Sequence, residues 1–218
     1  MIEGIIFDMD GVISDTQKLH SRVETDLLRR YGINITPEEI TQKYSGVRTK
    51  EFFDELLKKQ KKEYNLDSLM DEKWKLMEKF ALHSVDAIEG SVDLIKRLNI
   101  EGYPLAVASA SNLNYVLSVL NTLKLKEYFT YVVSGDMVSK GKPNPESFLL
   151  AASKINIKPN LCLVIEDGVS GMIAAKDAGM YCIGLVQNKA KIFPTSNLVT
   201  SLHQITPKYL EELKYFSS

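Results

Sequence analysis

The stretch Gly4-Ile5-Ile6-Phe7-Asp8-Met9-Asp10-Gly11 decides how the rest of the sequence is interpreted. A β-branched and aromatic run that stops at acidic residues and then Gly is typical of a buried strand that breaks into a turn. Asp8 and Asp10 are therefore expected at the carboxyl end of that strand, the edge at which open α/β sheets bind ligands. Two carboxylates so close repel each other unless a cation or a proton neutralises one of them. On this stretch alone, a solvated turn rich in Asp is an equally good interpretation.

The composition is that of an ordinary folded protein. The chain has 218 residues, 44% of them hydrophobic and 25% charged, with a formal net charge of -1. This length suits a main domain with a smaller insertion. The balanced charge argues against a nucleic-acid partner. No apolar run is long enough to span a bilayer, and the start of the chain does not resemble a signal peptide. We therefore expect no membrane partner and a cytoplasmic location.

Residues 16–83 have the pattern of a separate helical unit. Apolar residues recur at spacings of three and four from Leu19 to Leu28, which predicts an amphipathic helix. A second helix is expected to begin at Thr36, which can form a capping box with Glu39. Two more helices are expected after a turn at Ser45-Gly46-Val47, roughly from Thr49 to Tyr64 and from Ser68 to Leu82.

From Ile88 onward, short apolar strands alternate with amphipathic helices, which is the signature of βαβ units and a parallel sheet. The expected strands are 104–108, 131–134, 161–165 and 181–185, and the expected helices are 90–100, 113–123, one capped by Asn144, and 168–178. Cys162 and Cys182 fall in these strands and are expected to be buried free thiols. The pattern predicts an α/β fold with a parallel-sheet core, residues 1–15 and 84–218, and an inserted all-helical unit, residues 16–83.

Polar residues follow four of these strands, and parallel strands bring all four ends to one edge of the sheet. The four groups are Asp8 with Asp10, Ser109-Ala110-Ser111-Asn112, Lys140-Gly141-Lys142-Pro143, and Glu166-Asp167-Gly168. Each group alone has an ordinary explanation as a cap, a turn or a solvated side chain, but together they are better explained by one site. Asp8, Asp167 and a backbone carbonyl offer the hard oxygen ligands that Mg2+ prefers. Ser109, nearby N–H groups and Lys142 suit a phosphoryl group, which points to phosphoryl transfer.

The motifs at these positions resemble those of the haloacid dehalogenase superfamily. Phe-Asp-Met-Asp-Gly-Val, Ser-Ala-Ser, Gly-Lys-Pro-Asn-Pro-Glu and Ile-Glu-Asp-Gly occur in the order found in that superfamily, over nearly the whole chain. The resemblance is closest to the branch that contains β-phosphoglucomutase and the sugar-phosphate phosphatases. It implies a Rossmann-like core and a helical insertion that acts as a mobile cap.

The resemblance also implies a role for each motif residue. Asp8 would be the nucleophile that forms an aspartyl phosphate, and Asp10 the general acid and then the base. Mg2+ would bind to Asp8, the Asp10 carbonyl and Asp167, with Glu166 in or next to the coordination shell. The phosphoryl oxygens would be held by Ser109, the Ala110 N–H and Lys142. Asp10 must be protonated when it meets the leaving oxygen, so we expect its pKa to be raised by the neighbouring carboxylates and by closure of the cap.

The aspartyl phosphate could be discharged by water or by a second hydroxyl of the same sugar, and the cap is expected to decide between the two. A mutase of this branch grips a distal phosphate with Lys where Ser45 stands, Arg where Thr49 stands and Lys where Asn112 stands. The missing cations favour a phosphatase for a small sugar or polyol phosphate. Arg48 is expected to help read that substrate, and His20 and Asn112 are further candidates for substrate contact.

Two alternatives to a phosphatase stay open at this stage. One is β-phosphoglucomutase, an isomerase. The other is a ligand sensor that kept the fold without the chemistry, although a sensor has no need of both Asp8 and Asp10. The expected partner is a small phosphorylated metabolite, and a monomeric chain is favoured.

Overall fold

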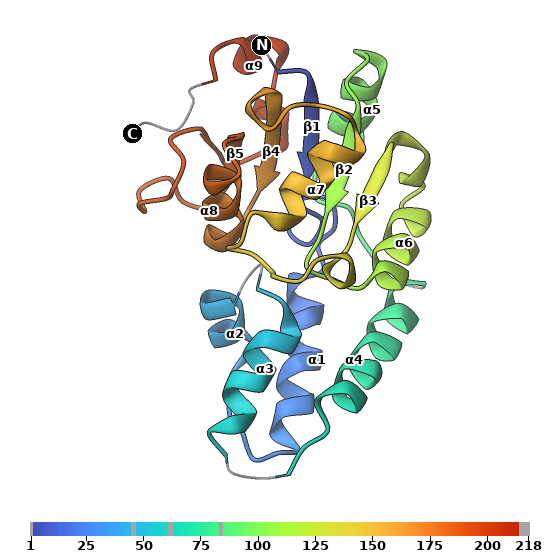
Figure 1. The fold of residues 1–218 in the computed structure, drawn as a ribbon, viewed down its shortest axis with the longest axis vertical. Coiled ribbons are helices and arrows are strands. Elements are labelled where there is room, and N and C mark those ends of the chain that lie inside the picture. The colour runs from blue at the N-terminus through green and yellow to red at the C-terminus, as the bar shows by residue number, and fades with distance from the viewer. Residues whose placement is uncertain (1, 45–46, 61–62, 83–84, 214–218) are drawn as a thin grey trace.

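The computed structural model describes residues 2–44, 47–60, 63–82 and 85–213, in which a sheet covered by helices stands above a helical unit (Figure 1). The described strands form one parallel sheet in the order β3-β2-β1-β4-β5-β6. The strands are β1 Gly4–Phe7, β2 Leu105–Ala108, β3 Tyr131–Val133, β4 Cys162–Glu166, β5 Tyr181–Leu185 and β6 Leu198–Val199. This confirms the predicted α/β fold with a parallel, Rossmann-like sheet.

Helices connect the strands and also build the unit at the end of the sheet. Those beside the sheet are α5 Ser91–Ile100, α6 Leu113–Thr122, α7 Glu146–Lys154, α8 Val169–Asp177 and the short α9 Pro207–Glu211. Those of the helical unit, which we call the cap, are α1 Gln17–Arg29, α2 Pro37–Tyr44, α3 Thr49–Lys58 and α4 Leu66–Ala81. Among the described residues, no helix has the length and apolar character needed to cross a membrane.

Strand β1 shows why the sheet is buried on both faces. Successive side chains of a strand point to opposite faces. Ile5 and Phe7 therefore belong to one hydrophobic cluster, which includes residues of α5 and α6, whereas Ile6 packs in a second cluster with Phe148 of α7 and Met172 of α8. The first cluster continues into the cap. Cap and sheet thus share buried apolar surface.

The position of β1 between β2 and β4 places the opening motif at the centre of the sheet edge. Phe7 is in register with Val107 of β2 and with Ile165 of β4. The chain continues this pairing for one residue, because the Asp8 amide donates to the Ile165 carbonyl at 3.0 Å. Residues that follow β2 and β4 therefore flank Asp8.

Two chain segments join the cap to the sheet, and they run side by side. The Asp15 amide donates to the Asp86 carbonyl, and the Ile88 amide donates to the Ile13 carbonyl, each at 2.9 Å. We propose that the cap extends from residue 16 to 83 and that the core comprises 1–15 and 84–218. Residues 83 and 84, at the second border, lie outside the described part of the chain.

Several predicted details are confirmed and one helix is shorter than predicted. Thr36 and Glu39 form the capping box, with reciprocal hydrogen bonds of 2.9 and 3.2 Å, and both cysteines are buried and free. Helix α3 ends at Lys58 instead of Tyr64. The sequence offers no apolar side chain from 58 to 63 to hold further turns against the cap. The predicted turn residues Ser45 and Gly46 lie outside the described residues, and β6 and α9 were not predicted.

Candidate active site

Lys142 lies at the centre of a buried charged cluster at the carboxyl edge of the sheet. Its Nζ lies 2.5 Å from Asp8 Oδ1 and 2.7 Å from Glu166 Oε2, and all three side chains are buried. Burial lowers the pKa of Lys142, but the two carboxylates outweigh this effect and raise it. The lysine is thus a fixed positive charge. Its ammonium also lies 4.7 Å from the centroid of the Phe148 ring.

Carboxylate oxygens from three acidic residues lie within 4.8 Å of one another at this edge: Asp8, Glu166 and Asp167. Burial and then Glu166 raise the pKa of Asp8 to about 8, against the opposing effect of Lys142. Burial, Glu166 and Asp8 raise the pKa of Asp167 well above its ordinary value. One lysine does not balance three carboxylates, and hard oxygen ligands converging on one point suit a divalent cation such as Mg2+. The predicted ligand set Asp8, Glu166 and Asp167 is therefore brought together.

Gly11 allows the loop after β1 to approach this acidic cluster closely. Its φ is +96°, and a Cβ at this position would lie 2.5 Å from both Asp167 Oδ2 and Gln17 Nε2. Gln17 Nε2 donates to the Asp167 carboxylate and lies 3.5 Å from the Asp10 carbonyl oxygen. The amide of Gln17 thus connects the Asp10 carbonyl, which is a predicted metal ligand, to Asp167. Gln17 was not predicted from the sequence as a site residue.

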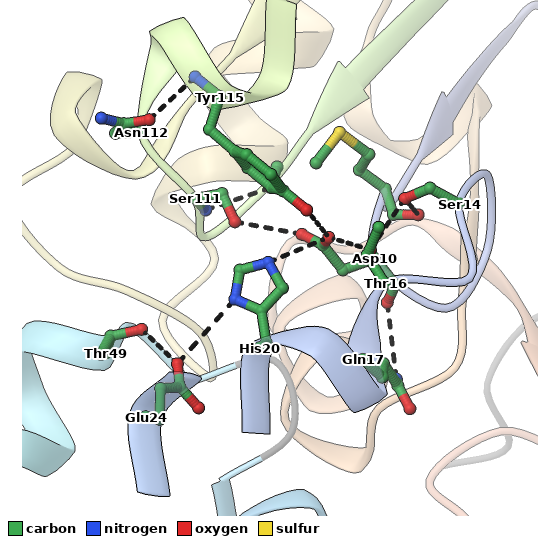
Figure 2. A network of polar contacts seen from close by, with 12 residues as sticks. Asp10, Ser14, Thr16, Gln17, His20, Glu24, Thr49, Ser111, Asn112 and Tyr115 are labelled. Carbon is green, nitrogen blue, oxygen red and sulfur yellow. Dashed lines mark hydrogen bonds and ion pairs between the residues drawn. The ribbon is translucent and has the colours of Figure 1, made fainter. Parts of the chain in front are cut away.

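The Asp10 carboxylate is surrounded by donors from three segments (Figure 2). Thr16 Oγ1 donates to Oδ1 at 2.5 Å, Ser111 Oγ donates to Oδ2 at 3.0 Å, and the Tyr115 hydroxyl lies 3.4 Å from Oδ1. His20 Nε2 also lies 3.3 Å from Oδ1, as an ion pair. Asp10 is therefore held as an acceptor of several hydrogen bonds.

This environment contradicts the expectation that the pKa of Asp10 is raised. Burial does raise it, but His20 and the hydrogen bonds from Thr16 and Ser111 outweigh burial and lower the pKa to about 2. The pKa of His20 is raised, because Asp10 outweighs the opposing effect of burial. In this arrangement Asp10 is ionised, and its charge favours the protonated form of His20. The sequence shows the neighbouring acids of Asp10 but not the donors that folding brings from the cap and from the segment after β2.

The predicted phosphate-binding residues lie beside Asp8 and Asp10. Ser109 is 2% exposed, and its Oγ accepts a hydrogen bond of 3.1 Å from the Ser111 amide. Asn112 Oδ1 caps α6 by accepting from the Tyr115 amide at 2.9 Å (Figure 2), and its contact with a substrate stays a prediction. Such capping is the ordinary behaviour of Asn before a helix.

A cavity connects the sheet edge to the cap. Its lining from the core comprises Asp8, Asp10, Ala110 and Ser111, and its lining from the cap side comprises Gln17, His20, Ser21, Glu24, Ile40, Thr41, Tyr44, Val47, Thr49 and Phe52. The nucleophile candidate, the acid candidate and Ala110 thus face the same space. His20 is among the lining residues, and its contact with a substrate stays a prediction.

Arg48 lies at the border of cap and core but not in the lining of this cavity. Its Nη1 lies 3.2 Å from the Ser139 carbonyl oxygen and 3.5 Å from the Val138 carbonyl oxygen, in the loop that leads to Lys142. Glu51, one turn further along α3, accepts a hydrogen bond of 3.2 Å from the Gly141 amide. In this arrangement Arg48 joins α3 to the core loop, and its contact with a substrate stays a prediction.

The cap also contains a buried ion pair that was not predicted from the sequence. Lys73 Nζ lies 2.6 Å from Glu24 Oε1, and Thr49 Oγ1 donates to the same oxygen at 2.8 Å. The signal was present in the spacing, because Glu24 falls four residues after His20 and four before Leu28, on the buried face of α1. Lys73 lies between Met70 and Met77 on the buried face of α4 in the same way.

The model of the family described as haloacid dehalogenase-like hydrolase matches residues 5–185. The chain belongs to this family. Fructose-1-phosphate phosphatase YqaB of Escherichia coli is 32% identical to it over 81% of the chain and 93% of the relative. A phosphorylated carbohydrates phosphatase of Thermotoga maritima is 31% identical over 82% of each protein. Among solved structures, the β-phosphoglucomutase of Clostridium difficile has a TM-score of 0.85 and 28% identity, covering 97% of the chain and 96% of the other. These haloacid dehalogenase-like relatives are therefore similar to the chain over both core and cap.

Proposed function

We propose that this haloacid dehalogenase-like hydrolase is a Mg2+-dependent phosphatase that cleaves a small sugar or polyol phosphate through an aspartyl phosphate on Asp8. One observation carries the proposal: Asp8 and Asp10 line the same cavity, with Lys142 against Asp8 and the cap above. The names of the relatives, which refer to phosphorylated carbohydrates and to fructose 1-phosphate, support the substrate class. The family and the acidic cluster support the metal.

Mg2+ would be held by Asp8, Asp167 and the Asp10 carbonyl, with Glu166 beside them. When bound, it supplies positive charge that lets an anionic phosphate approach an anionic carboxylate. The residues fit this cation because they offer hard oxygen donors. They also form a cluster with excess negative charge, in which Asp8 and Glu166 are buried and Asp167 is half-buried. Lys142 and the backbone N–H groups near Ser109 and Ala110 would hold the phosphoryl oxygens.

The chain's own groups account for the bonds and protons of both steps. The Asp8 carboxylate attacks phosphorus, and the bond to the leaving oxygen breaks. Asp10 gives that oxygen a proton, which the His20 imidazolium, 3.3 Å away, can supply to it. A water molecule then attacks the aspartyl phosphate and gives its proton back to the Asp10–His20 pair. Phosphate leaves, and Asp8 is a free carboxylate again.

The cap side of the cavity supports water as the final acceptor. Among the described residues that line the cavity from the cap, none is Lys or Arg. Lys73 is fully buried in its ion pair with Glu24, and Arg48 contacts core carbonyls. A mutase needs cations in this wall to hold the distal phosphate of a bisphosphate. The similarity of β-phosphoglucomutase to this chain keeps that enzyme as the second candidate.

The decisive experiment compares two reactions of the purified protein with Mg2+. Phosphate release is measured from a panel of sugar and polyol monophosphates, and conversion of β-glucose 1-phosphate to glucose 6-phosphate is measured in parallel. We expect phosphate release to be faster for at least one monophosphate. Isomerisation that outpaces phosphate release would establish the mutase instead. Inactivity on every substrate, with the fold verified by circular dichroism, would favour a ligand sensor.

A further inference from the structure

The buried pair of Glu24 and Lys73 presents one sign of charge to the cavity. Glu24 lines the cavity, whereas Lys73 does not and is 0% exposed. Lys73 approaches from behind, where its ammonium also lies 4.2 Å from the centroid of the Trp74 ring. A substrate in the cavity therefore meets a carboxylate first and is separated from the ammonium by that carboxylate.

In the part of the chain that the structure describes, neighbours engage only one of the two Glu24 carboxylate oxygens. Lys73, Thr49 and, at 3.9 Å, His20 all approach Oε1. Among the described residues, Oε2 accepts no hydrogen bond, and in Figure 2 the second oxygen points away from Thr49 and His20. A carboxylate oxygen can accept more than one hydrogen bond and donates none. Oε2 is thus suited to accept a hydrogen bond from a hydroxyl, and it repels an anion.

We propose that Glu24, fixed in place by Lys73, determines substrate specificity by accepting a hydrogen bond from a hydroxyl of the substrate and by excluding a second phosphate. The inference rests on the proposed phosphatase function and names its substrate class: polyhydroxylated monophosphates, not bisphosphates and not plain alkyl phosphates. Apart from His20, which pairs with Asp10, the wall around Glu24 agrees with an uncharged substrate end, because Ser21, Thr41 and Thr49 add hydroxyls and Ile40, Tyr44 and Phe52 add apolar surface.

A test must separate substrate recognition by Glu24 from an indirect effect of Glu24 on catalysis. Glu24 also faces His20, which contacts Asp10, so a change at Glu24 can alter the rate on every substrate. A ratio of kcat/KM values for two substrates cancels this common effect. A merely structural role of the ion pair would change both values by the same factor and leave the ratio unmoved.

Two variants address the two halves of the proposal. Glu24→Leu/Lys73→Met replaces the ion pair by apolar side chains of similar size, a change that buried pairs often tolerate. Glu24→Gln leaves the ammonium of Lys73 without a charged partner. The matched control is Asp26→Asn, which removes an exposed acid from the same helix. Thermal unfolding verifies that each variant is folded.

For the double variant, the readout is the preference for glucitol 6-phosphate over n-hexyl phosphate, which has the same number of carbons but no hydroxyl. We expect this preference to fall at least tenfold, as for the loss of a hydrogen bond to a charged group. For Glu24→Gln, the readout is the preference for fructose 1,6-bisphosphate over fructose 1-phosphate. We expect it to rise at least tenfold, because no carboxylate then offsets the charge of the Lys73 ammonium behind the cavity wall. Asp26→Asn should change neither ratio.

The outcomes distinguish the inference from the proposed function. If the wild type hydrolyses monophosphates but both ratios stay within threefold in the two variants, Glu24 does not read the substrate and the inference is wrong while the phosphatase stands. If the wild type isomerises faster than it releases phosphate, or hydrolyses bisphosphates as readily as monophosphates, the inference is overturned before any variant is made. A change in the same ratios for Asp26→Asn would also overturn it.

Discussion

Asp8 is the side chain on which the chemistry depends, and its surroundings suit an amide as well as a carboxylate. Asp8→Asn retains an oxygen that can accept from Lys142 but loses the nucleophile. We expect phosphate release to fall by roughly 10^4-fold or more, as for other essential nucleophiles, while the melting temperature stays the same or rises. The melting temperature rises if the relief of the repulsion among Asp8, Glu166 and Asp167 outweighs the loss of the ion pair with Lys142.

Steady-state phosphate release and thermal unfolding check this prediction. Asp15→Asn is the matched control, since Asp15 is an exposed acid only a few residues further along the chain. The control should keep the activity of the wild type. Substantial turnover by the Asp8→Asn protein would remove Asp8 from the mechanism.

Glu24 makes folding stability depend on pH. Its pKa is lowered from 4.5 to about 2, because Lys73 and His20 outweigh the opposing effect of burial. The unfolded chain therefore takes up the proton at a higher pH than the folded chain does. The stabilisation is fully present above about pH 4.5 and is lost as the pH falls toward 2. Its size is on the order of 3 kcal/mol, of which about 2 kcal/mol is lost between pH 7 and pH 3.

Denaturant unfolding near pH 7 and near pH 3 measures this effect when the wild type is compared with Glu24→Leu/Lys73→Met. The catalytic acids titrate in both proteins, so the difference between the two losses isolates the ion pair. The wild type should lose more stability than the double variant. Equal losses would mean that Glu24 titrates in the folded protein as it does in the unfolded chain.

At the scale of elements, α1 connects the cap to the chemistry. Gln17, His20, Ser21 and Glu24 all line the cavity, and their spacing of three and four residues places them on one helical face. The same helix buries Val23, Leu27 and Leu28 in the hydrophobic core. Packing of α1 therefore fixes the site residues, so a shift of the cap moves His20 relative to Asp10.

The contact between α3 and the loop before Lys142 is the second link between cap and core. Arg48 and Glu51 bond to backbone groups of Val138, Ser139 and Gly141. For Arg48→Ala we expect KM to rise about tenfold, and by the same factor for different sugar phosphates. The reason is that the loss of these charged hydrogen bonds weakens the docking of the cap on the core and does not affect substrate recognition. Unfolding should shift little, since Arg48 lies near the surface.

Kinetics on at least two substrates check this prediction, with Lys50→Ala as the control. Lys50 is also a cap cation of α3, but it pairs with exposed Asp67. A rise in KM for only one sugar phosphate would support the prediction that Arg48 contacts the substrate directly. Unchanged kinetics would show that neither role applies.

At the scale of the whole molecule, the acidic cluster couples metal binding to stability. Asp8 comes from the end of β1, and Glu166 and Asp167 from the end of β4, so they converge only in the folded chain. Mg2+ should therefore stabilise the folded state, by about 2.7 kcal/mol at a concentration of 100 times Kd. For a chain of this size that is on the order of 5–10 °C in Tm.

Thermal unfolding in millimolar MgCl2, compared with NaCl of equal ionic strength, measures this shift without reference to activity. Asp167→Asn should lose most of it, because the variant removes a carboxylate from the cluster. A shift of equal size in Asp167→Asn would place the cation elsewhere. No shift in the wild type would contradict the predicted metal site.

The fold and the core motifs are largely a property of the local sequence. Apolar runs such as Ile5-Ile6-Phe7 specify buried strands, and the alternation of strands with amphipathic helices specifies a parallel sheet. Parallel strands have their carboxyl ends at one edge, so Asp8, Ser109, Lys142 and Glu166 had to meet there. Their residue types then limited the chemistry to anion and metal binding.

The surroundings of those residues were decided only by tertiary structure. The charge state of Asp10 depends on His20, Thr16 and Ser111, which neighbouring residues in the sequence do not reveal. The roles of Arg48 and Asn112 depend on which backbone groups lie near them after the cap packs on the core. Glu24 and Lys73 are 49 residues apart in the sequence, and only folding brings them together as a buried ion pair. Periodicity determines which face of an element is buried, whereas pKa values and specificity depend on the distances between elements, which packing sets.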